Sequence, residues 1–328
     1  MTGVFLVAGG VIWGMNSSHM VPSDERDSAP LLLAHRGVHQ SFDRAGVENE
    51  TCTASRINKP THEFLENTRA SIQAALEYGA DMIEIDVHPT TDGEFAVFHD
   101  WTLDCRTNGT GRVRDHSSVD LRKLDIGYGY SFDGGKSFPF RGKYFGQMPM
   151  LGELLNHFPT THFLINIKSS SSDEGRRLMQ YLSARNRNNS SVSIYGHQDP
   201  IDAARQVNPN LMTMGKQQAK SCLKTYAAVG WSGYVPKNCR KSLVPVPENF
   251  VHFIWGWPAR FQARMKKYES KIILMGPHTK ARSEPAIDTL DQLSNISPHF
   301  GGIIWTNKIE VIGPHMKGLT KSAHSSPL

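Results

Sequence analysis

The sequence has few of the features that mark a nucleic-acid-binding protein. No run of lysine or arginine stands out among its 328 residues, and the net charge is only +5, so a nucleic-acid partner is not indicated. There is no internal repeat and no low-complexity segment. Hydrophobic residues make up 39% of the chain and charged residues 20%, as is typical of a globular protein. The mild positive charge is compatible with anionic substrates or membrane surfaces.

No apolar stretch is long enough to span a bilayer comfortably, since that takes about 20 residues. Residues 3–15 are apolar and uncharged, and their length suits the core of a signal peptide. A basic preceding region and a clear A-x-A cleavage site are both missing. We expect residues 1–30 to be an N-terminal apolar segment, a signal peptide or an anchor, followed by an exposed linker. A buried first helix is the alternative.

This division predicts that the protein is exported, whether periplasmic, secreted or membrane-anchored, and that it associates with membranes through its N-terminus. A cytoplasmic location is the alternative. Residues 31–328 then form one large domain.

Cysteine is scarce, and its spacing excludes common metal sites. The four cysteines include no C-x-x-C pair, which argues against zinc. In an exported protein an even count favours disulfides. Cys222 and Cys239 flank one short segment and can pair locally, which leaves Cys52 with Cys105, each in a loop. In a cytosolic protein all four would instead be free thiols.

Residues 82–88 predict a strand with unusual polar side chains. Glu84, Asp86 and His88 share one face, because side chains alternate along a strand, and the aliphatic residues share the other. Two carboxylates and a histidine on an apolar strand cost stability unless something binds them. An isolated alternation of this kind is also found in solvated antiparallel strands.

Two further apolar runs favour the functional interpretation. Residues 31–35 end at His35, and residues 95–99 end at His99. Polar groups at the carboxyl ends of several apolar strands are the arrangement of an α/β-barrel active site. The strand at 82–88 therefore predicts a catalytic floor.

The whole chain alternates predicted strands with predicted helices, which implies a parallel sheet. We count nine strand candidates: 31–35, 82–88, 95–98, 163–168, 192–196, 211–215, 252–256, 271–276 and 302–306. The helical patterns are 69–78, 174–186, 199–206, 217–229, 258–268 and 286–295. A closed barrel needs eight strands, so we expect 211–215 or 252–256 to be irregular or outside it.

Two long segments interrupt the alternation. Residues 38–64 lack periodicity, and residues 101–150 are rich in glycine and aromatic residues. Within the second segment, residues 127–135 suggest a hairpin-like excursion, and the region 101–150 is the best candidate for a wall over the site. The predicted fold class is α/β, a (β/α)8 TIM barrel with inserted loops after strands 1 and 3.

A series of short motifs carries a family resemblance. The motifs are His35-Arg36-Gly37, Glu66-Asn67-Thr68, Glu84-Ile85-Asp86, Thr91-Asp92-Gly93, Phe98-His99-Asp100, Arg106-Thr107-Asn108-Gly109 and Asn166-Ile167-Lys168. In this order they resemble the glycerophosphodiester phosphodiesterase family. The likeness runs from about residue 31 to 170, and residues 302–307 resemble the closing strand. Each tripeptide alone is weak, but their joint order and spacing are specific.

The resemblance implies a TIM barrel that hydrolyses deacylated phospholipids to an alcohol and glycerol phosphate with a divalent metal. Carried over by position, His35 and His99 resemble the acid–base pair. Glu84 and Asp86 resemble the metal ligands, with Asn166 at a further ligand position. Arg36, Glu66 and Lys168 resemble the substrate-binding groups, of which Arg36 and Lys168 also act in catalysis.

These residue types suit the chemistry. A phosphodiester carries a negative charge that repels nucleophiles, so a hard cation such as Mg²⁺ or Ca²⁺ has to neutralise it. Arg36 can bind phosphate oxygen in a bidentate manner, and Lys168 adds a point charge. One histidine accepts a proton from the attacking hydroxyl or water and the other protonates the leaving alkoxide.

The chain departs from the family pattern in three places. The family usually has a glutamate where this chain has Asn166, and a neutral amide should bind a cation more weakly. The loop at 38–64 is longer than typical and is expected to reshape the leaving-group pocket. The family's tryptophan near the end matches Trp255, Trp257 or Trp305. His88 is equally well explained as a hydrogen-bonding neighbour or as a ligand.

Two other functions remain open. A lysophospholipase D-like or phospholipase D-like hydrolase would act on a lysolipid that keeps an acyl chain, and would use the apolar N-terminus to approach the membrane. A non-enzymatic phosphodiester-binding protein would have lost its metal site at Asn166. The presence of both histidines beside both carboxylates argues against the latter, because binding needs no proton-transfer pair.

Overall fold

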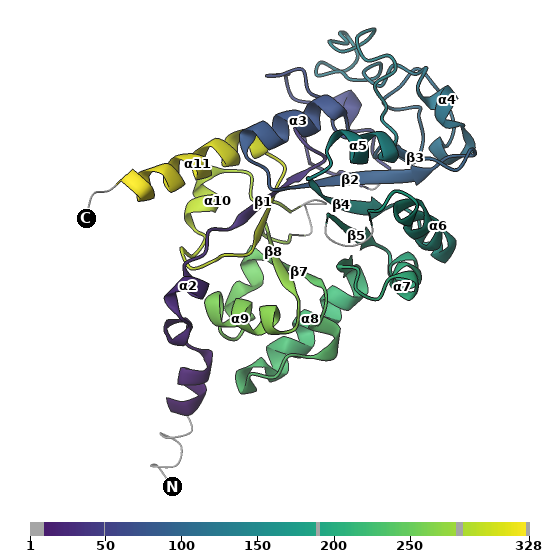
Figure 1. The fold of residues 1–328 in the computed structure, drawn as a ribbon. Coiled ribbons are helices and arrows are strands. Elements are labelled where there is room, and N and C mark those ends of the chain that lie inside the picture. The colour runs from purple at the N-terminus through teal and green to yellow at the C-terminus, as the bar shows by residue number, and fades with distance from the viewer. Residues whose placement is uncertain (1–9, 49, 188–190, 280–284, 326–328) are drawn as a thin grey trace.

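A ring of parallel strands lies at the centre of the molecule (Figure 1). The computed structural model describes residues 10–48, 50–187, 191–279 and 285–325. In this part of the chain the ring contains eight strands, hydrogen-bonded in the order β6-β5-β4-β2-β1-β9-β8-β7. They are β1 (Leu31–His35), β2 (Met82–Pro89), β4 (His162–Ile167), β5 (Val192–Gly196), β6 (Thr213–Gly215), β7 (Leu243–Pro247), β8 (Lys271–Met275) and β9 (Ile303–Thr306). A parallel bridge between Thr213 and Ser242 joins the two ends. The predicted TIM barrel is confirmed.

Helices cover the outside of the ring (Figure 1). Besides the helical residues 10–16, the α-helices in the described part of the chain are α2 (Ser23–Arg26), α3 (Arg69–Tyr78), α4 (Ser118–Leu121), α5 (Leu151–His157), α6 (Ser172–Ser183), α7 (Gln198–Val207), α8 (Lys216–Val229), α9 (Ala259–Lys267), α10 (Leu290–Ser294) and α11 (Ile309–Ser325). Single 3-10 turns are η1 (Ser18–Met20), η2 (Ala54–Arg56), η3 (Val113–Asp115), η4 (Gly230–Ser232), η5 (Lys237–Cys239) and η6 (Glu248–Phe253). The helix predicted at 69–78 has those bounds because the Thr68 hydroxyl caps its start and Gly79, with φ 108°, ends it.

Strand β2 shows how the two faces of the ring differ. Its side chains are buried along its whole length. Ile83, Ile85 and Val87 pack outward in the large core that includes α3 and α5. Met82 packs inward with Leu33 and Leu164 in an apolar plug. The next inward positions along β2 carry Glu84 and Asp86, so the polar groups lie directly above the plug.

The expectation that either 211–215 or 252–256 is irregular is confirmed, whereas the inclusion of the strand at 95–98 in the barrel was wrong. Residues 95–97 form β3 (Phe95–Val97), which pairs antiparallel with β2 and lies outside the ring. Residues 252–256 are not a strand, as η6 and a turn occupy them, whereas 211–215 contributes β6. The remaining barrel strand is β7, whose sequence LVPVP contains two prolines. Proline normally argues against a strand in the middle of a sheet, so the sequence did not predict β7.

The two long insertions pack against each other. Residues 38–64 are largely irregular, as expected, and residues 98–150 form turns with η3 and α4. They share a second small core, which includes Phe42, Ile57 and Tyr130. A disulfide between Cys52 and Cys105, with Cα atoms 5.5 Å apart, joins them. The second disulfide links Cys222 in α8 to Cys239 in η5. Both predicted pairings are confirmed.

The N-terminal segment lies at the amino-terminal ends of the strands. Residues 10–16 are helical, and the side chain of Trp13 is 68% exposed, so the alternative of a buried first helix is wrong for these residues. Arg264 of α9 donates to the Met15 carbonyl and to Asn16. Residues 1–9 lie outside the described residues. No helix in the described part combines the length and the apolar character that crossing a membrane requires.

Candidate active site

A cavity of about 320 Å³ opens at the carboxyl-terminal end of the barrel strands. Its lining includes His35 at the end of β1, Asn166 in β4, Lys168 directly after β4 and Tyr195 in β5. The first insertion contributes Phe42, Val47, Glu48, Thr51 and Thr53, and the second contributes His99 and Trp101. Of the region 101–150, which we predicted as a wall over the site, Trp101 lines this cavity and residues 127–135 do not. Tyr130 instead lies behind it, next to Arg106.

Two buried carboxylates form the floor of the site. Glu84 accepts hydrogen bonds from the Tyr195 hydroxyl at 2.6 Å and from the Arg36 backbone N–H at 3.1 Å. Asp86 accepts from Asn166 Nδ2 at 2.8 Å and from Asn67 Nδ2 at 3.1 Å. Asp86 also forms an ion pair with Arg36 Nε at 3.2 Å.

The pKa values of the two carboxylates are shifted in opposite directions. Burial and the neighbouring Asp86 hold the pKa of Glu84 well above its usual value. Burial also acts to raise the pKa of Asp86, but Lys168 and Arg36 outweigh it and hold that pKa well below its usual value. Lys168 Nζ lies 3.6 Å from Asp86. Asp86 is therefore the member of the pair whose charged form its surroundings favour.

The two histidines face this floor, and each has a partner on Nδ1. His35 donates from Nδ1 to Asn307 Oδ1 at 2.6 Å, and its Nε2 lies 3.6 Å from Glu84. The Asn307 amide nitrogen is bonded to Asp288 at 3.1 Å, which turns its oxygen towards His35. His99 Nδ1 lies 2.7 Å from Asp100. In both rings Nδ1 is therefore the nitrogen that an oxygen acceptor orients.

The sequence suggested that His99 ends a barrel strand. In the structure it instead follows β3, which is antiparallel to β2 and lies outside the barrel. It reaches the cavity because β3 folds back along β2, and the Phe98 backbone N–H donates to the Asp86 carbonyl at 3.0 Å. His88 is fully buried, and burial lowers its pKa to about 3. Its ring packs against Trp101, so its position fits a neutral neighbour of the site.

Arg36 and Glu66 form a second group beside the floor. Arg36 has a left-handed backbone with φ 59°, and its Nη1 lies 3.4 Å from Glu66. Glu66 also lies 3.1 Å from Arg106. Its burial acts to raise its pKa, but Arg106 and Arg36 outweigh this and lower it. Glu66 thus touches two arginines in this structure.

The donor set can be compared with the needs of a divalent cation. Among the described residues, no group of three or more histidine, cysteine, aspartate or glutamate side chains is arranged to hold a metal. Glu84 and Asp86 nevertheless offer two hard, buried oxygen donors, and Mg²⁺ often uses one or two carboxylates together with substrate phosphate oxygens. Asn166 presents its amide nitrogen to Asp86. The residues fit a cation held by two carboxylates.

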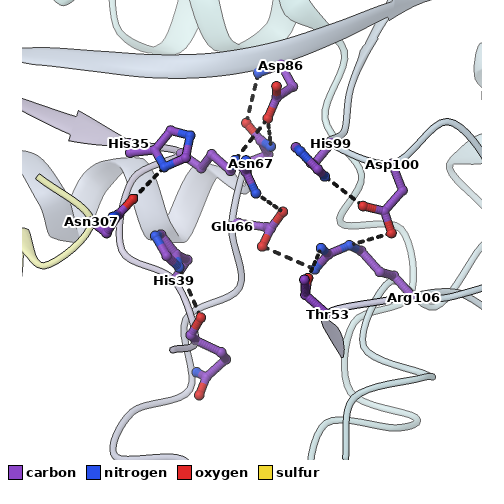
Figure 2. Close-up of polar contacts among 12 residues, drawn as sticks. His35, His39, Thr53, Glu66, Asn67, Asp86, His99, Asp100, Arg106 and Asn307 are labelled. Carbon is purple, nitrogen blue, oxygen red and sulfur yellow. Dashed lines mark hydrogen bonds and ion pairs between the residues drawn. The ribbon is translucent and has the colours of Figure 1, made fainter. Parts of the chain in front are cut away.

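Several residues around the site had no predicted role. Tyr195 donates to Glu84, and its single position in the sequence gives no periodic or charge signal. Asn67 and Asn307, which orient Asp86 and His35, lie in segments that carry the family resemblance, yet nothing in the sequence shows these contacts. Asp100 and Arg106 stand within the quoted motifs, yet only the fold shows what they contact (Figure 2). Trp305 packs on His35 with ring centroids 5.0 Å apart, which identifies the tryptophan near the site among the three candidates.

Comparisons with known proteins show what this sequence is similar to. A sequence model of the Glycerophosphoryl diester phosphodiesterase family matches residues 35–241. The Glycerophosphodiester phosphodiesterase of Caldanaerobacter subterraneus is 39% identical over 108 residues, which are 32% of this chain and 40% of that protein. The human Lysophospholipase D GDPD1 is 25% identical over 70% of this chain and 66% of its own length. The matched segment thus spans about two fifths of the bacterial relative.

The fold is also similar to that of solved structures. The crystal structure of the glycerophosphoryl diester phosphodiesterase domain of a Mycobacterium tuberculosis protein superposes with a TM-score of 0.61 at 15% identity, covering 89% of this chain and 100% of that domain.

Proposed function

Since this chain belongs to the glycerophosphoryl diester phosphodiesterase family, we propose that it is a phosphodiesterase that hydrolyses glycerophosphodiesters to an alcohol and glycerol phosphate. One observation carries the proposal. Two histidines, each with its Nδ1 occupied by an acceptor, line one cavity. A buried carboxylate pair lies beneath that lining and accepts hydrogen bonds from Tyr195 and Asn166, which line the cavity. Binding a phosphodiester needs cations, but only catalysis needs two groups that move protons.

The cationic side chains bind the phosphodiester. Arg36 and Lys168 both line the cavity and supply positive charge next to Asp86. A guanidinium matches two phosphate oxygens, and an ammonium adds a point charge. A divalent cation such as Mg²⁺ or Ca²⁺, held by Glu84 and Asp86 with Asn166 beside them, would neutralise the charge of the phosphodiester.

The two histidines divide the proton transfers. One imidazole takes a proton from the attacking hydroxyl or water through Nε2, while the other gives a proton to the departing alkoxide. His99 has the carboxylate of Asp100 on its Nδ1, at 2.7 Å. His35 has the neutral acceptor Asn307 instead. The two rings are therefore held in different electrostatic surroundings, as opposite roles require.

The first test is product release from glycerophosphocholine with and without EDTA. We expect turnover that EDTA abolishes and Mg²⁺ or Ca²⁺ restores, and Glu84→Ala or Asp86→Ala should abolish it as well. Undiminished activity after EDTA treatment would contradict the metal requirement, and absence of hydrolysis under every condition would contradict the enzyme.

The second test separates the histidines. Replacing either with alanine should lower kcat/KM by about 10²- to 10⁴-fold, the usual size of an acid–base contribution. A nitrophenyl phosphodiester needs little protonation of its leaving group, so the variant that lacks the general acid should recover much of its rate on that substrate. The variant that lacks the base should not. An equal response of both variants would contradict the division of labour.

A lysophospholipase D activity is the second candidate. The human relative that matches most of the chain carries that name, and the N-terminal helix exposes Val11, Trp13 and Met15. Exposed apolar side chains of this kind suit approach to a lipid surface. Choline release from lysophosphatidylcholine vesicles distinguishes this activity from the first.

A further inference from the structure

Arg106 lies at the centre of a buried polar network between the two insertions (Figure 2). Its side chain is only 2% exposed. It donates from Nε to Asp100 at 2.9 Å, from Nη2 to the Thr53 hydroxyl at 2.7 Å and from Nη1 to the Tyr130 hydroxyl at 2.7 Å. Nη1 also lies 3.1 Å from Glu66. All three nitrogen atoms of this guanidinium are therefore engaged.

The two carboxylates that contact Arg106 each hold a group of the cavity. The other oxygen of Asp100 lies 2.7 Å from His99 Nδ1. The other oxygen of Glu66 lies 3.4 Å from Arg36 Nη1. One buried guanidinium thus connects one of the two histidines to the arginine that binds phosphate. Arg106 itself does not line the cavity.

The Cys52–Cys105 disulfide is covalently adjacent to this network. Cys52 directly precedes Thr53, and Cys105 directly precedes Arg106. The disulfide therefore lies one residue before the hydrogen bond from Arg106 Nη2 to Thr53 Oγ1 on both sides of the contact. The bridge links points 53 residues apart in the sequence. Two backbone hydrogen bonds also join the insertions, from Ser131 to the Ala54 carbonyl at 2.9 Å and from Ile57 to the Ser131 carbonyl at 3.2 Å. The disulfide adds the covalent link next to Arg106.

We propose that Arg106 is a positioning residue that fixes His99 through Asp100 and Arg36 through Glu66, and that the Cys52–Cys105 disulfide holds Arg106 in this place. The proposal rests on the proposed phosphodiesterase function. Arg106 transfers no proton and touches no substrate. Its two arms act on different steps, since His99 acts in turnover and Arg36 in substrate binding.

The two arms predict a split between kcat and KM. Asp100→Asn should lower kcat with little change in KM, and Glu66→Gln should raise KM with little change in kcat. Arg106→Lys keeps the charge but not the planar fork, so it should do both. Since a displacement of about 1 Å can cost on the order of 10²-fold, we expect kcat for Arg106→Lys to fall about tenfold or more.

Double mutants separate positioning from a general structural role. In a His99→Ala background, Arg106→Lys should lower kcat by less than about twofold, because the group it positions is already gone. In an Arg36→Ala background, its effect on KM should likewise disappear. Equal factors for Arg106→Lys in the wild-type and mutant backgrounds would mean independent effects, and would overturn the proposal.

The second disulfide provides a matched control for the first. Cys52→Ser/Cys105→Ser should shift kcat and KM in the same directions as Arg106→Lys, whereas Cys222→Ser/Cys239→Ser should leave both within about twofold. Thr53→Val removes the hydrogen bond to Arg106 and leaves the disulfide intact, so it gives the same test if the cysteine variant does not fold. Two outcomes would overturn the role of Cys52–Cys105. In the first, neither Cys52→Ser/Cys105→Ser nor Thr53→Val changes kcat or KM. In the second, loss of either disulfide impairs the kinetics equally.

Two measurements do not depend on catalysis, and they separate this proposal from the proposed function. Nitrogen NMR of the full-length chain should show His99 protonated on Nδ1, and Arg106→Lys should make the two tautomers exchange. Calorimetry with sn-glycerol 3-phosphate should show weaker binding for Arg106→Lys. An inactive wild type in which both shifts occur would refute the phosphodiesterase and support Arg106, and a normal His99 spectrum with normal binding in Arg106→Lys would overturn the role of Arg106.

Discussion

Asn166 is the residue at which the floor of the site departs from the family pattern. It places a neutral amide where the family usually has a glutamate, and its nitrogen donates to Asp86 at 2.8 Å. With asparagine at this position, the floor has one carboxylate fewer than it would have with glutamate. Any cation would depend on Glu84, Asp86 and the phosphate oxygens of the substrate.

We predict that Asn166→Glu raises the apparent affinity for Mg²⁺ by about tenfold or more, because a third anionic oxygen joins the floor. The same change should lower the melting temperature in EDTA, since three buried carboxylates then repel one another. Calorimetric titration with Mg²⁺ checks the first effect and thermal unfolding the second. Asn166→Gln is the neutral control, and identical titrations for the two variants would show that position 166 does not reach the ion.

Asp92 illustrates a residue that acts on stability and not on the site. It accepts hydrogen bonds from the hydroxyls of Thr90 and Ser118 and from the Ser118 backbone N–H. These bonds, from Thr90 first and Ser118 second, lower its pKa to about 2 from 3.8. It thereby ties the turn between β2 and β3 to the start of α4.

We predict that Asp92→Asn lowers the free energy of unfolding at pH 7 by about 1 kcal/mol, a value reduced for solvent exposure. A depressed carboxyl pKa contributes stability above the unfolded pKa, and this contribution is lost as the pH falls through the folded pKa. The difference between wild type and variant should therefore shrink between about pH 4 and pH 2. Urea unfolding at pH 7, 4, 3 and 2 measures it, and a constant difference across this range would contradict the assignment.

At the scale of elements, periodicity predicted what is locally encoded. The strand at 82–88 and the helix at 69–78 follow from alternation and from the Thr68 and Gly79 boundaries. Strand β7 was missed because its two prolines contradict strand propensity, and only its place between β6 and β8 explains it. The antiparallel direction of β3 likewise depends on pairing with β2, which no local pattern records.

The candidate site divides in the same way. His35, Glu84 and Lys168 stand on or just after barrel strands, so the sequence could bring them together. Contacts across the insertions, such as Arg106 with Glu66, join residues far apart in the chain through irregular loops. Irregular segments have no period from which their partners could be inferred.

The Cys222–Cys239 disulfide stabilises the junction of α8 and η5. Both cysteines are almost fully buried, and the bridge spans 17 residues. In the chain-entropy model a loop of this length corresponds to about 3 kcal/mol. We predict that Cys222→Ser/Cys239→Ser lowers the free energy of unfolding in urea by about this amount.

Peptide mass spectrometry without reduction is the matching measurement, and it should find Cys222 linked to Cys239 and Cys52 to Cys105. Four free thiols, or a serine variant as stable as the wild type, would contradict the prediction. Two disulfides also support our proposal that the protein is exported, because such bonds persist in oxidising compartments.

For the whole molecule, the two ends of the barrel have different tasks. The cavity lies at the carboxyl-terminal ends of the strands, and no described residue before β1 lines it. The N-terminal segment packs at the opposite end, where Asp27 lies 2.8 Å from His299 and Arg264 donates to the Met15 carbonyl. A segment so placed can bind a lipid surface without entering the site.

We predict that deleting residues 1–27 leaves kcat/KM for glycerophosphocholine within about twofold, because the cavity loses none of its lining. The same deletion should abolish sedimentation with anionic vesicles, since the apolar side chains that would enter the lipid interface are then gone. Choline release from lysophosphatidylcholine in those vesicles should fall with it, whereas release from the water-soluble substrate should not.

A full-length control separates lost lipid contact from lost stability. The substitutions Val11→Ser, Trp13→Ser and Met15→Ser remove exposed side chains but keep the bonds from Arg264 to the Met15 carbonyl and to Asn16. The triple variant should therefore melt like the wild type, yet fail to sediment with vesicles. If it sediments normally, or if the truncated chain does, the N-terminal segment is not the membrane contact, and a substrate that keeps its acyl chain would have to approach the cavity by another surface.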